Sequence, residues 1–137
     1  MLGLMMNRPL LISTIAEHAE KFHGDREIVS VTMDNPGHRY TIREAMGRTR
    51  QLANALGKLG LERGDRVAIL SKNCAEWLIA DVAISMAGLV SVPIYPTAGA
   101  GTIRYVLEHS GSRAVIVGRL DDPTQANEAI SGDLITI

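Results

Sequence analysis

The 137-residue chain has almost no cysteine and almost no net charge. It contains a single cysteine, Cys74, and its formal net charge is −1. One cysteine cannot form an internal disulfide, which fits a reducing compartment, and we expect a cytoplasmic protein. The small net charge, without any dense run of basic residues, gives no reason to expect nucleic acid or an anionic membrane as a partner.

Long hydrophobic runs are also lacking. The uncharged stretch 82–101 is interrupted by Gly88, Pro93 and Pro96, which disfavours a membrane-spanning helix. Residues 1–12 have only short apolar stretches and no small-residue cleavage site, so we expect no signal peptide. Apolar residues nevertheless make up 46% of the chain and charged residues 21%, which is typical of one globular domain with a real core.

The rest of the pattern alternates between helical and strand periodicity. Helices are predicted at about residues 10–22, 41–59, 74–87, 102–109 and 124–130, and strands at 27–33, 38–40, 66–70, 89–94, 114–117 and 134–137. The start of the first helix is open, because Thr14 and Glu17 have capping-box spacing. Residues 34–37 (DNPG) predict a turn. This order predicts an α/β domain with a mostly parallel sheet flanked by helices, and a short antiparallel hairpin near residues 27–40.

Polar residues mark where two of the helices begin. Thr41 and Glu44 have the spacing of a capping box at the start of the second helix. Asn73 is expected to cap the third helix, with Glu76 three residues further on. Gly88 is a natural stop for that helix.

Apolar residues recur at helical spacing in three of the predicted helices. The first helix carries Leu11, Ile15, Ala19 and Phe22, and the second carries Ile42, Ala45, Thr49, Leu52, Ala53 and Leu56. The third helix has one stripe through Ala75, Leu78, Ile79, Val82 and Met86 and another through Trp77, Ala80, Ile84 and Ala87. Because this third helix is apolar nearly all round, we expect it to lie between two other layers.

From Tyr40 onward the order of these features is specific to one family. The segments YTIREAMGRTRQLANAL, GLERGDRVAILSKNCAEWLIADVAISMAGLVSVPIYPT and IRYVLEHSGSRAVIVG follow one another. They include the Gly64-Asp65-Arg66-Val67 turn into a strand, Asn73 with Glu76-Trp77, the strand into Pro93, and the pattern of Tyr105, His109 and Ser110. Together they resemble the N-terminal region of the AMP-forming synthetase family, which includes acyl-CoA synthetases, luciferases and peptide-synthetase adenylation domains. The sequence Ile94-Tyr95-Pro96-Thr97 looks most like the long-chain fatty acyl branch.

The resemblance implies a two-step reaction in the intact enzyme. A carboxylate attacks the α-phosphate of ATP to form an acyl-adenylate, and coenzyme A then takes the acyl group, with ATP, magnesium and coenzyme A all required. The family's phosphate loop, adenine pocket and mobile C-terminal domain lie downstream of the matched region. We therefore expect residues 1–137 to be a single truncated N-terminal subdomain that binds none of these cofactors, has no catalytic residue or metal site, and is inactive alone.

The resemblance also implies where ligand contacts and partners would lie. In related synthetases the region of Tyr95, Pro96 and Thr97 is near the coenzyme A entry. Arg104, early in the next helix, is a candidate for contact with a coenzyme phosphate there. A solvated arginine is the favoured reading of Arg104. The expected partner is the remainder of the synthetase chain. Self-association of the truncated piece is also expected, because a sheet edge and apolar helix faces would be uncovered.

Other readings of the motifs stay open. Residues 96–102 (PTAGAGT) could form a phosphate loop, but they lack the lysine that such loops use. Gly99 and Gly101 also resemble the start of a dinucleotide motif, although Arg104 stands where its third glycine belongs. The alternative functions are therefore a non-catalytic binding or assembly module of the same fold, and a small nucleotide-binding domain that uses the 96–102 loop.

Overall fold

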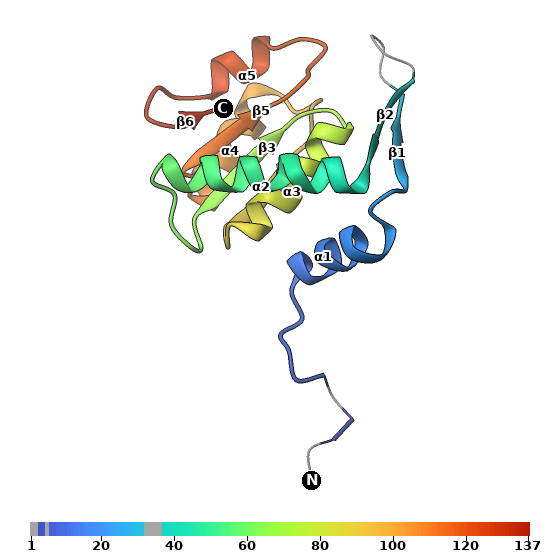
Figure 1. Cartoon of the computed structure of the whole chain (residues 1–137). Helices are drawn as coiled ribbons and strands as arrows, with labels where there is room; N and C mark the ends of the chain where they lie inside the picture. Colours follow the sequence, from blue (N-terminus) through green and yellow to red (C-terminus); the bar gives the residue numbers. More distant parts are fainter. Residues whose placement is uncertain (1–2, 5, 32–36) are drawn as a thin grey trace.

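The computed structural model describes residues 3–4, 6–31 and 37–137. An antiparallel pair is formed by β1 (Glu27–Ser30) and β2 (His38–Thr41). The helices α1 (Ile12–His23) and α2 (Ile42–Lys58) flank this pair in the sequence, and Figure 1 shows it at the N-terminal end of α2, apart from the main sheet. The hairpin near residues 27–40 is confirmed. Its first strand ends at Ser30, and residues 32–33 of the predicted strand and most of the predicted 34–37 turn lie outside the described residues.

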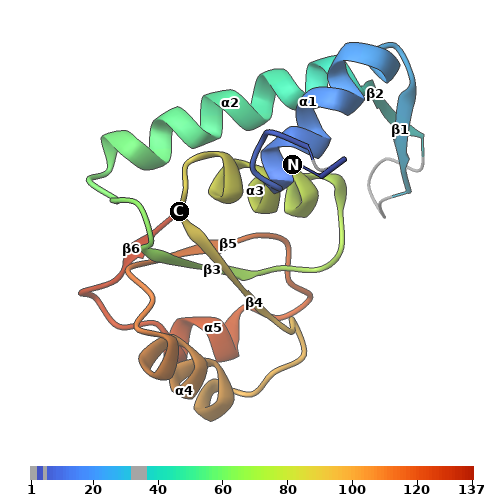
Figure 2. The ribbon, with the colours of Figure 1, turned by 90° about the horizontal axis from the view of Figure 1, so that it is seen from below.

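The main sheet has four parallel strands in the order β4-β3-β5-β6. They are β3 (Arg66–Leu70), β4 (Val90–Ile94), β5 (Ala114–Val117) and β6 (Ile135–Thr136). The connecting helices are α3 (Ala75–Met86), α4 (Ala100–Ser110) and α5 (Thr124–Ala129). In Figure 2, α1, α2 and α3 lie on one side of the sheet, and α4 and α5 lie on the other. The predicted α/β class with a mostly parallel sheet is confirmed.

The central strand β3 supplies both layers of the core because its side chains alternate between the two faces. Val67 and Ile69 pack with α2 and α3, whereas Ala68 and Leu70 pack with α4 and α5. All four residues are at most 1% exposed. The apolar residues 67–70 (VAIL) of this strand are therefore buried on both faces, as parallel strands covered by helices require.

Helix α3 lies between two layers, as its sequence predicts. Ala80 and Ile84 face the sheet side of the core, while Ala75 and Ile79 pack with Tyr40, Ala45 and Met46 on the side of α1 and α2. One member of the predicted stripes differs, because Leu78 is 45% exposed. Helix α2 covers α3 on the side that faces away from the sheet (Figure 2).

The cap expected at Asn73 is wrong. The N-cap residue of α3 is Cys74, in an extended conformation and without a side-chain cap. The backbone N–H of Lys72 donates to the carbonyl of Arg119 at 3.1 Å, so the chain is still attached to the exit of β5 at that point. The first turn of α3 comes after this hydrogen bond. In that turn the Leu78 N–H donates to the Cys74 carbonyl.

The capping box at the start of α2 is confirmed. Thr41 accepts a hydrogen bond from Glu44 N–H at 3.2 Å, and the Glu44 carboxylate accepts from Thr41 N–H at 2.8 Å. Replacing Thr41 with alanine is expected to lower the free energy of unfolding by about 1 kcal/mol. Chemical denaturation checks this value, with Thr14→Ala as control because Thr14 lies inside α1 and caps nothing. Equal losses in the two variants would contradict the capping role.

Helix α1 differs most from its predicted pattern. It begins at Ile12, and of its residues Ala16 is the buried one, whereas Leu11, Ile15 and Phe22 are 53%, 71% and 61% exposed. Ala16 packs in the core cluster that also contains Tyr40, Ala45 and Ile79. One turn further on, the guanidinium of Arg50 in α2 donates to both carboxylate oxygens of Glu20, at 2.7 and 2.8 Å.

This ion pair predicts a pH dependence of stability. The hydrogen bonds from Arg50 lower the pKa of Glu20 below its ordinary value of 4.5. The stabilisation is therefore complete above about pH 4.5 and is lost as the pH falls through the lower folded-state pKa. Glu20→Gln should reduce stability near neutral pH by less than about 1 kcal/mol and flatten the acid loss. Denaturation at a series of pH values, with exposed Glu17→Gln as control, tests this; an unchanged acid slope in Glu20→Gln would contradict it.

Candidate functional site

The strand order creates a topological switch between β3 and β5. From β3 the chain passes through α3 to β4 on one side, and from β5 it passes through α5 to β6 on the other side. The helices α3 and α5 lie on opposite faces of the sheet (Figure 2). In open α/β sheets ligands bind outside the carboxyl ends of the strands at such a point. This edge is therefore the candidate functional site.

Ser71 and Gly118 follow β3 and β5 directly and lie against each other. Ser71 is 4% exposed, and the N–H of Gly118 donates to the Leu70 carbonyl at 3.0 Å. A Cβ atom added to Gly118 would lie 2.3 Å from Ser71 Oγ and 2.6 Å from Ser71 Cβ. Only a glycine permits this approach, so the two strand exits are held in contact. An ion pair between Lys72 and Asp121 joins the loops that follow.

A cavity of about 160 Å³ opens beside this contact, on the α3 side of the sheet. It is lined by Ile69, Ser71, Cys74, Glu76, Trp77, Ala80, Ile116, Gly118 and Arg119. Cys74 is partly buried, with its Sγ atom 4.0 Å from Ser71 Oγ. Sequence reasoning missed Ser71 and Gly118. The signal that points to them is a small residue directly after each of two buried strands.

The predicted coenzyme-facing residues Tyr95, Pro96 and Thr97 form the turn between β4 and α4, at the same carboxyl edge. Tyr95 is 84% exposed and its carbonyl accepts a hydrogen bond from Ala98 N–H at 3.0 Å. Pro96 is half-buried and Thr97 is exposed. The turn therefore presents the Tyr95 and Thr97 side chains to solvent beside the candidate site.

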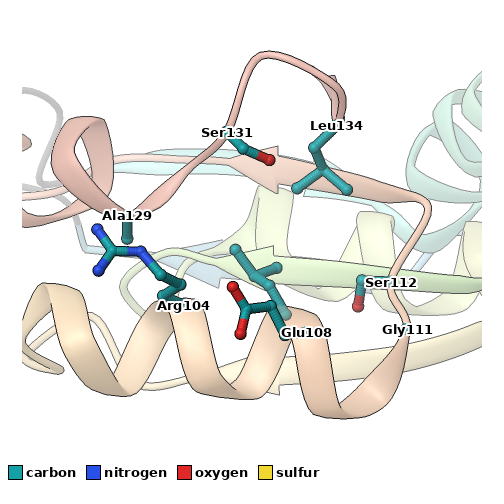
Figure 3. A pocket seen from close by; sticks show the side chains of 8 residues that line it. Arg104, Glu108, Gly111, Ser112, Ala129, Ser131 and Leu134 are labelled. Atoms are coloured by element: carbon teal, nitrogen blue, oxygen red, sulfur yellow. The ribbon is translucent and has the colours of Figure 1, made fainter.

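Arg104, the fourth predicted site residue, is directed toward α5. Its guanidinium donates to the Glu128 carbonyl at 2.9 Å. It lines a groove of about 350 Å³ between α4 and the segment around Ser131 and Leu134, where Figure 3 shows it beside Glu108. Residues 95–97 do not line this groove. The structure thus brings Tyr95, Pro96 and Thr97 together and gives Arg104 a different set of neighbours.

The small residues of the 96–102 loop have structural roles of their own. Helix α4 begins at Ala100, two residues earlier than predicted, and the Ala100 N–H donates to the Gln125 side-chain oxygen at 2.8 Å. The N–H groups of Thr102 and Ile103 donate to the Gly99 carbonyl. A Cβ atom added to Gly101 would meet nothing within 4 Å. A phosphate loop needs free amides and close backbone approach, so these observations disfavour one here.

Tyr40, on β2, is a buried polar group near the start of α3. It is 7% exposed and packs in the same cluster as Ala75. Burial raises the pKa of its hydroxyl, and the nearby Glu76 carboxylate raises that pKa further. Within the described part of the chain this hydroxyl and His38 Nε2 have no hydrogen-bond partner.

Among residues 3–4, 6–31 and 37–137, no group of three or more His, Cys, Asp or Glu side chains is placed to hold a metal ion. No helix in those ranges is long and apolar enough to cross a membrane.

Comparison with known proteins points to one family. The family model described as AMP-binding enzyme matches residues 15–136. A medium-chain-fatty-acid–CoA ligase of Ectopseudomonas oleovorans is 40% identical over 122 residues, covering 89% of this chain and 22% of that protein. A long-chain-fatty-acid–CoA ligase of Mycobacterium bovis is 35% identical over 120 residues, covering 88% of this chain and 20% of that protein.

The solved structure of Klebsiella oxytoca NpsA in complex with 3-hydroxyanthranilyl-AMSN has a TM-score of 0.77 at 25% identity, covering 95% of this chain and 25% of that one. The chain spans about a fifth of the length of these curated relatives.

Proposed function

Since the chain belongs to the AMP-binding enzyme family, we propose that it is the N-terminal part of an AMP-dependent acyl-CoA synthetase. The observation that carries the proposal is the match over residues 15–136 together with the two fatty-acid–CoA ligases that align with most of the chain. The coverage of about a fifth of each relative supports a larger protein in which this chain is one subdomain.

The proposed reaction of that larger protein joins a fatty carboxylate to coenzyme A. The carboxylate displaces pyrophosphate from ATP to give an acyl-adenylate, and the coenzyme thiol then displaces AMP to give the acyl-CoA. ATP, magnesium and coenzyme A are its cofactors, and the cytoplasm is its proposed location. In this chain the exposed turn of Tyr95, Pro96 and Thr97 fits a coenzyme-facing role, because it lies beside the topological switch. We expect the 137 residues alone to be inactive.

Two measurements test the proposal together. The mass of the protein isolated from its native source should be several times the 14.8 kDa of this chain. That protein should form acyl-CoA and AMP from ATP, coenzyme A and a series of fatty acids, whereas the 137-residue chain should form neither. A native mass of 14.8 kDa would overturn the enzyme proposal and support the non-catalytic binding module instead.

The isolated chain is also expected to self-associate. Leu10, Ile15 and Phe22 are 88%, 71% and 61% exposed and lie in one N-terminal region, with no described element covering them. Exposed apolar clusters of this kind promote association in water. Sedimentation velocity should show oligomers at high concentration, and fewer of them in Ile15→Glu. The matched control is Tyr105→Ser, at an exposed position on α4. A monomer at every concentration would contradict the expectation.

A further inference from the structure

The short helix α5 holds the start of α4 at two places. Gln125 Oε1 accepts a hydrogen bond from the Ala100 N–H at 2.8 Å, and the Arg104 guanidinium donates to the Glu128 carbonyl at 2.9 Å. The first of these contacts joins residues 25 apart in the sequence and lies where the β4–α4 turn ends. Helix α5 therefore contacts α4 at its first residue and again one turn further on.

The N-terminus of α4 needs a partner from outside the helix. Its N-cap residue is Gly99, which has no side chain to accept from the free N–H groups of the first turn. Gln125 supplies the missing acceptor. A Cβ atom added to Gly99 would lie 3.6 Å from Gln125 Oε1, so the glutamine side chain runs directly alongside the N-cap.

Helix α5 is itself firmly placed. Ala126 and Ala129 are 2% and 5% exposed and belong to the same core cluster as Ile103 and Leu107 of α4. Asp122 accepts from the Thr124 N–H at 2.9 Å, just before the N-cap residue Pro123 and the start of α5. Helix α5 is therefore anchored to the core through its two alanines, while Gln125 lies on its exposed side.

We propose that Gln125 is a positioning residue for the coenzyme-facing turn. It acts through the Ala100 amide on Tyr95, Pro96 and Thr97, whose other end is fixed by the buried Ile94 of β4. The inference rests on the proposed function, because only there does this turn face coenzyme A. Gln125 touches no substrate; it sets the conformation of residues that do.

The first test uses the 137-residue chain and amide hydrogen exchange followed by NMR. Gln125→Ala should raise the exchange rate of the Ala100 amide by about fivefold, the effect of losing one ordinary hydrogen bond. Gln125→Glu keeps an oxygen acceptor and should leave that rate near the wild-type value. Gln51→Ala, at an exposed glutamine of α2, is the matched control for folding. An unchanged Ala100 rate in Gln125→Ala would overturn the inference.

The second test uses the full synthetase. Gln125→Ala should raise KM for coenzyme A several-fold while kcat and KM for ATP stay unchanged, and Gln125→Glu should restore the wild-type KM. Faster Ala100 exchange with an unchanged KM for coenzyme A in an active enzyme would overturn the positioning role while the proposed function stands. Absence of acyl-CoA formation by the wild-type protein would instead sink the proposed function, and a loss of kcat with every substrate would mark a merely structural role.

Discussion

Replacing Ile84 with alanine is expected to destabilise the protein by about 2–5 kcal/mol, the range for deleting a fully buried branched side chain. Ile84 is 0% exposed and lies in one core cluster with Leu56 of α2 and with Val67 and Ile69 of β3. Neighbours drawn from both a helix and the sheet cannot easily close around the cavity, because each is held by its own backbone hydrogen bonds. Urea denaturation monitored by circular dichroism measures the loss.

Leu78 on the same helix is the matched control for Ile84. Both belong to the apolar stripes of α3, but Leu78 is 45% exposed. Leu78→Ala should therefore cost less than about 1 kcal/mol, because less apolar surface leaves the core. Similar losses of stability at the two positions would mean that Leu78 is as buried as Ile84. That result would contradict the orientation of α3 described above.

Replacing Gly118 with alanine is expected to destabilise the protein by about 1–3 kcal/mol, through overpacking at the switch between β3 and β5. The new Cβ would lie 2.6 Å from Ser71 Cβ, an atom that cannot swing aside because it is attached directly to the backbone. The exits of β3 and β5 must then separate, which weakens the bond from Gly118 N–H to the Leu70 carbonyl. Denaturation measures the stability loss.

A double-mutant cycle shows whether Ser71 causes this loss. In a Ser71→Gly background the clash partner is absent, so Gly118→Ala should cost much less than in the wild-type background. Gly132→Ala is the control substitution, because a Cβ atom added there meets nothing within 4 Å. If Gly118→Ala costs the same with and without the Ser71 side chain, the contact is not what requires glycine.

Features that depend on neighbours in the sequence were predictable. The Thr41–Glu44 capping box spans one helical turn, and strand β3 has its predicted bounds. The alternation of helices and strands indicated the parallel sheet, and the ordered motifs from Tyr40 onward indicated the AMP-forming synthetase family, which the match over residues 15–136 confirms. The turn at Tyr95, Pro96 and Thr97 was placed after a strand, and it lies there.

Features that depend on distant residues were not predictable. Asn73 has the residue type and spacing of a cap, but the attachment of Lys72 to Arg119 moves the start of α3 beyond it. Helix α4 begins at Ala100, whose N–H donates to the Gln125 side chain, and Arg104 donates to the Glu128 carbonyl. Each partner becomes a neighbour only after the sheet has assembled.

The amino-acid sequence by itself determined the class of fold, the family, and the elements whose signals are local, because hydrophobic periodicity and capping act within a few residues. Only the tertiary structure decided which face of α1 is buried, where α3 and α4 begin, and that Ser71 and Gly118 touch. The reason is physical: those features follow from contacts between chain segments that the sheet brings together, and no short stretch of sequence contains both partners.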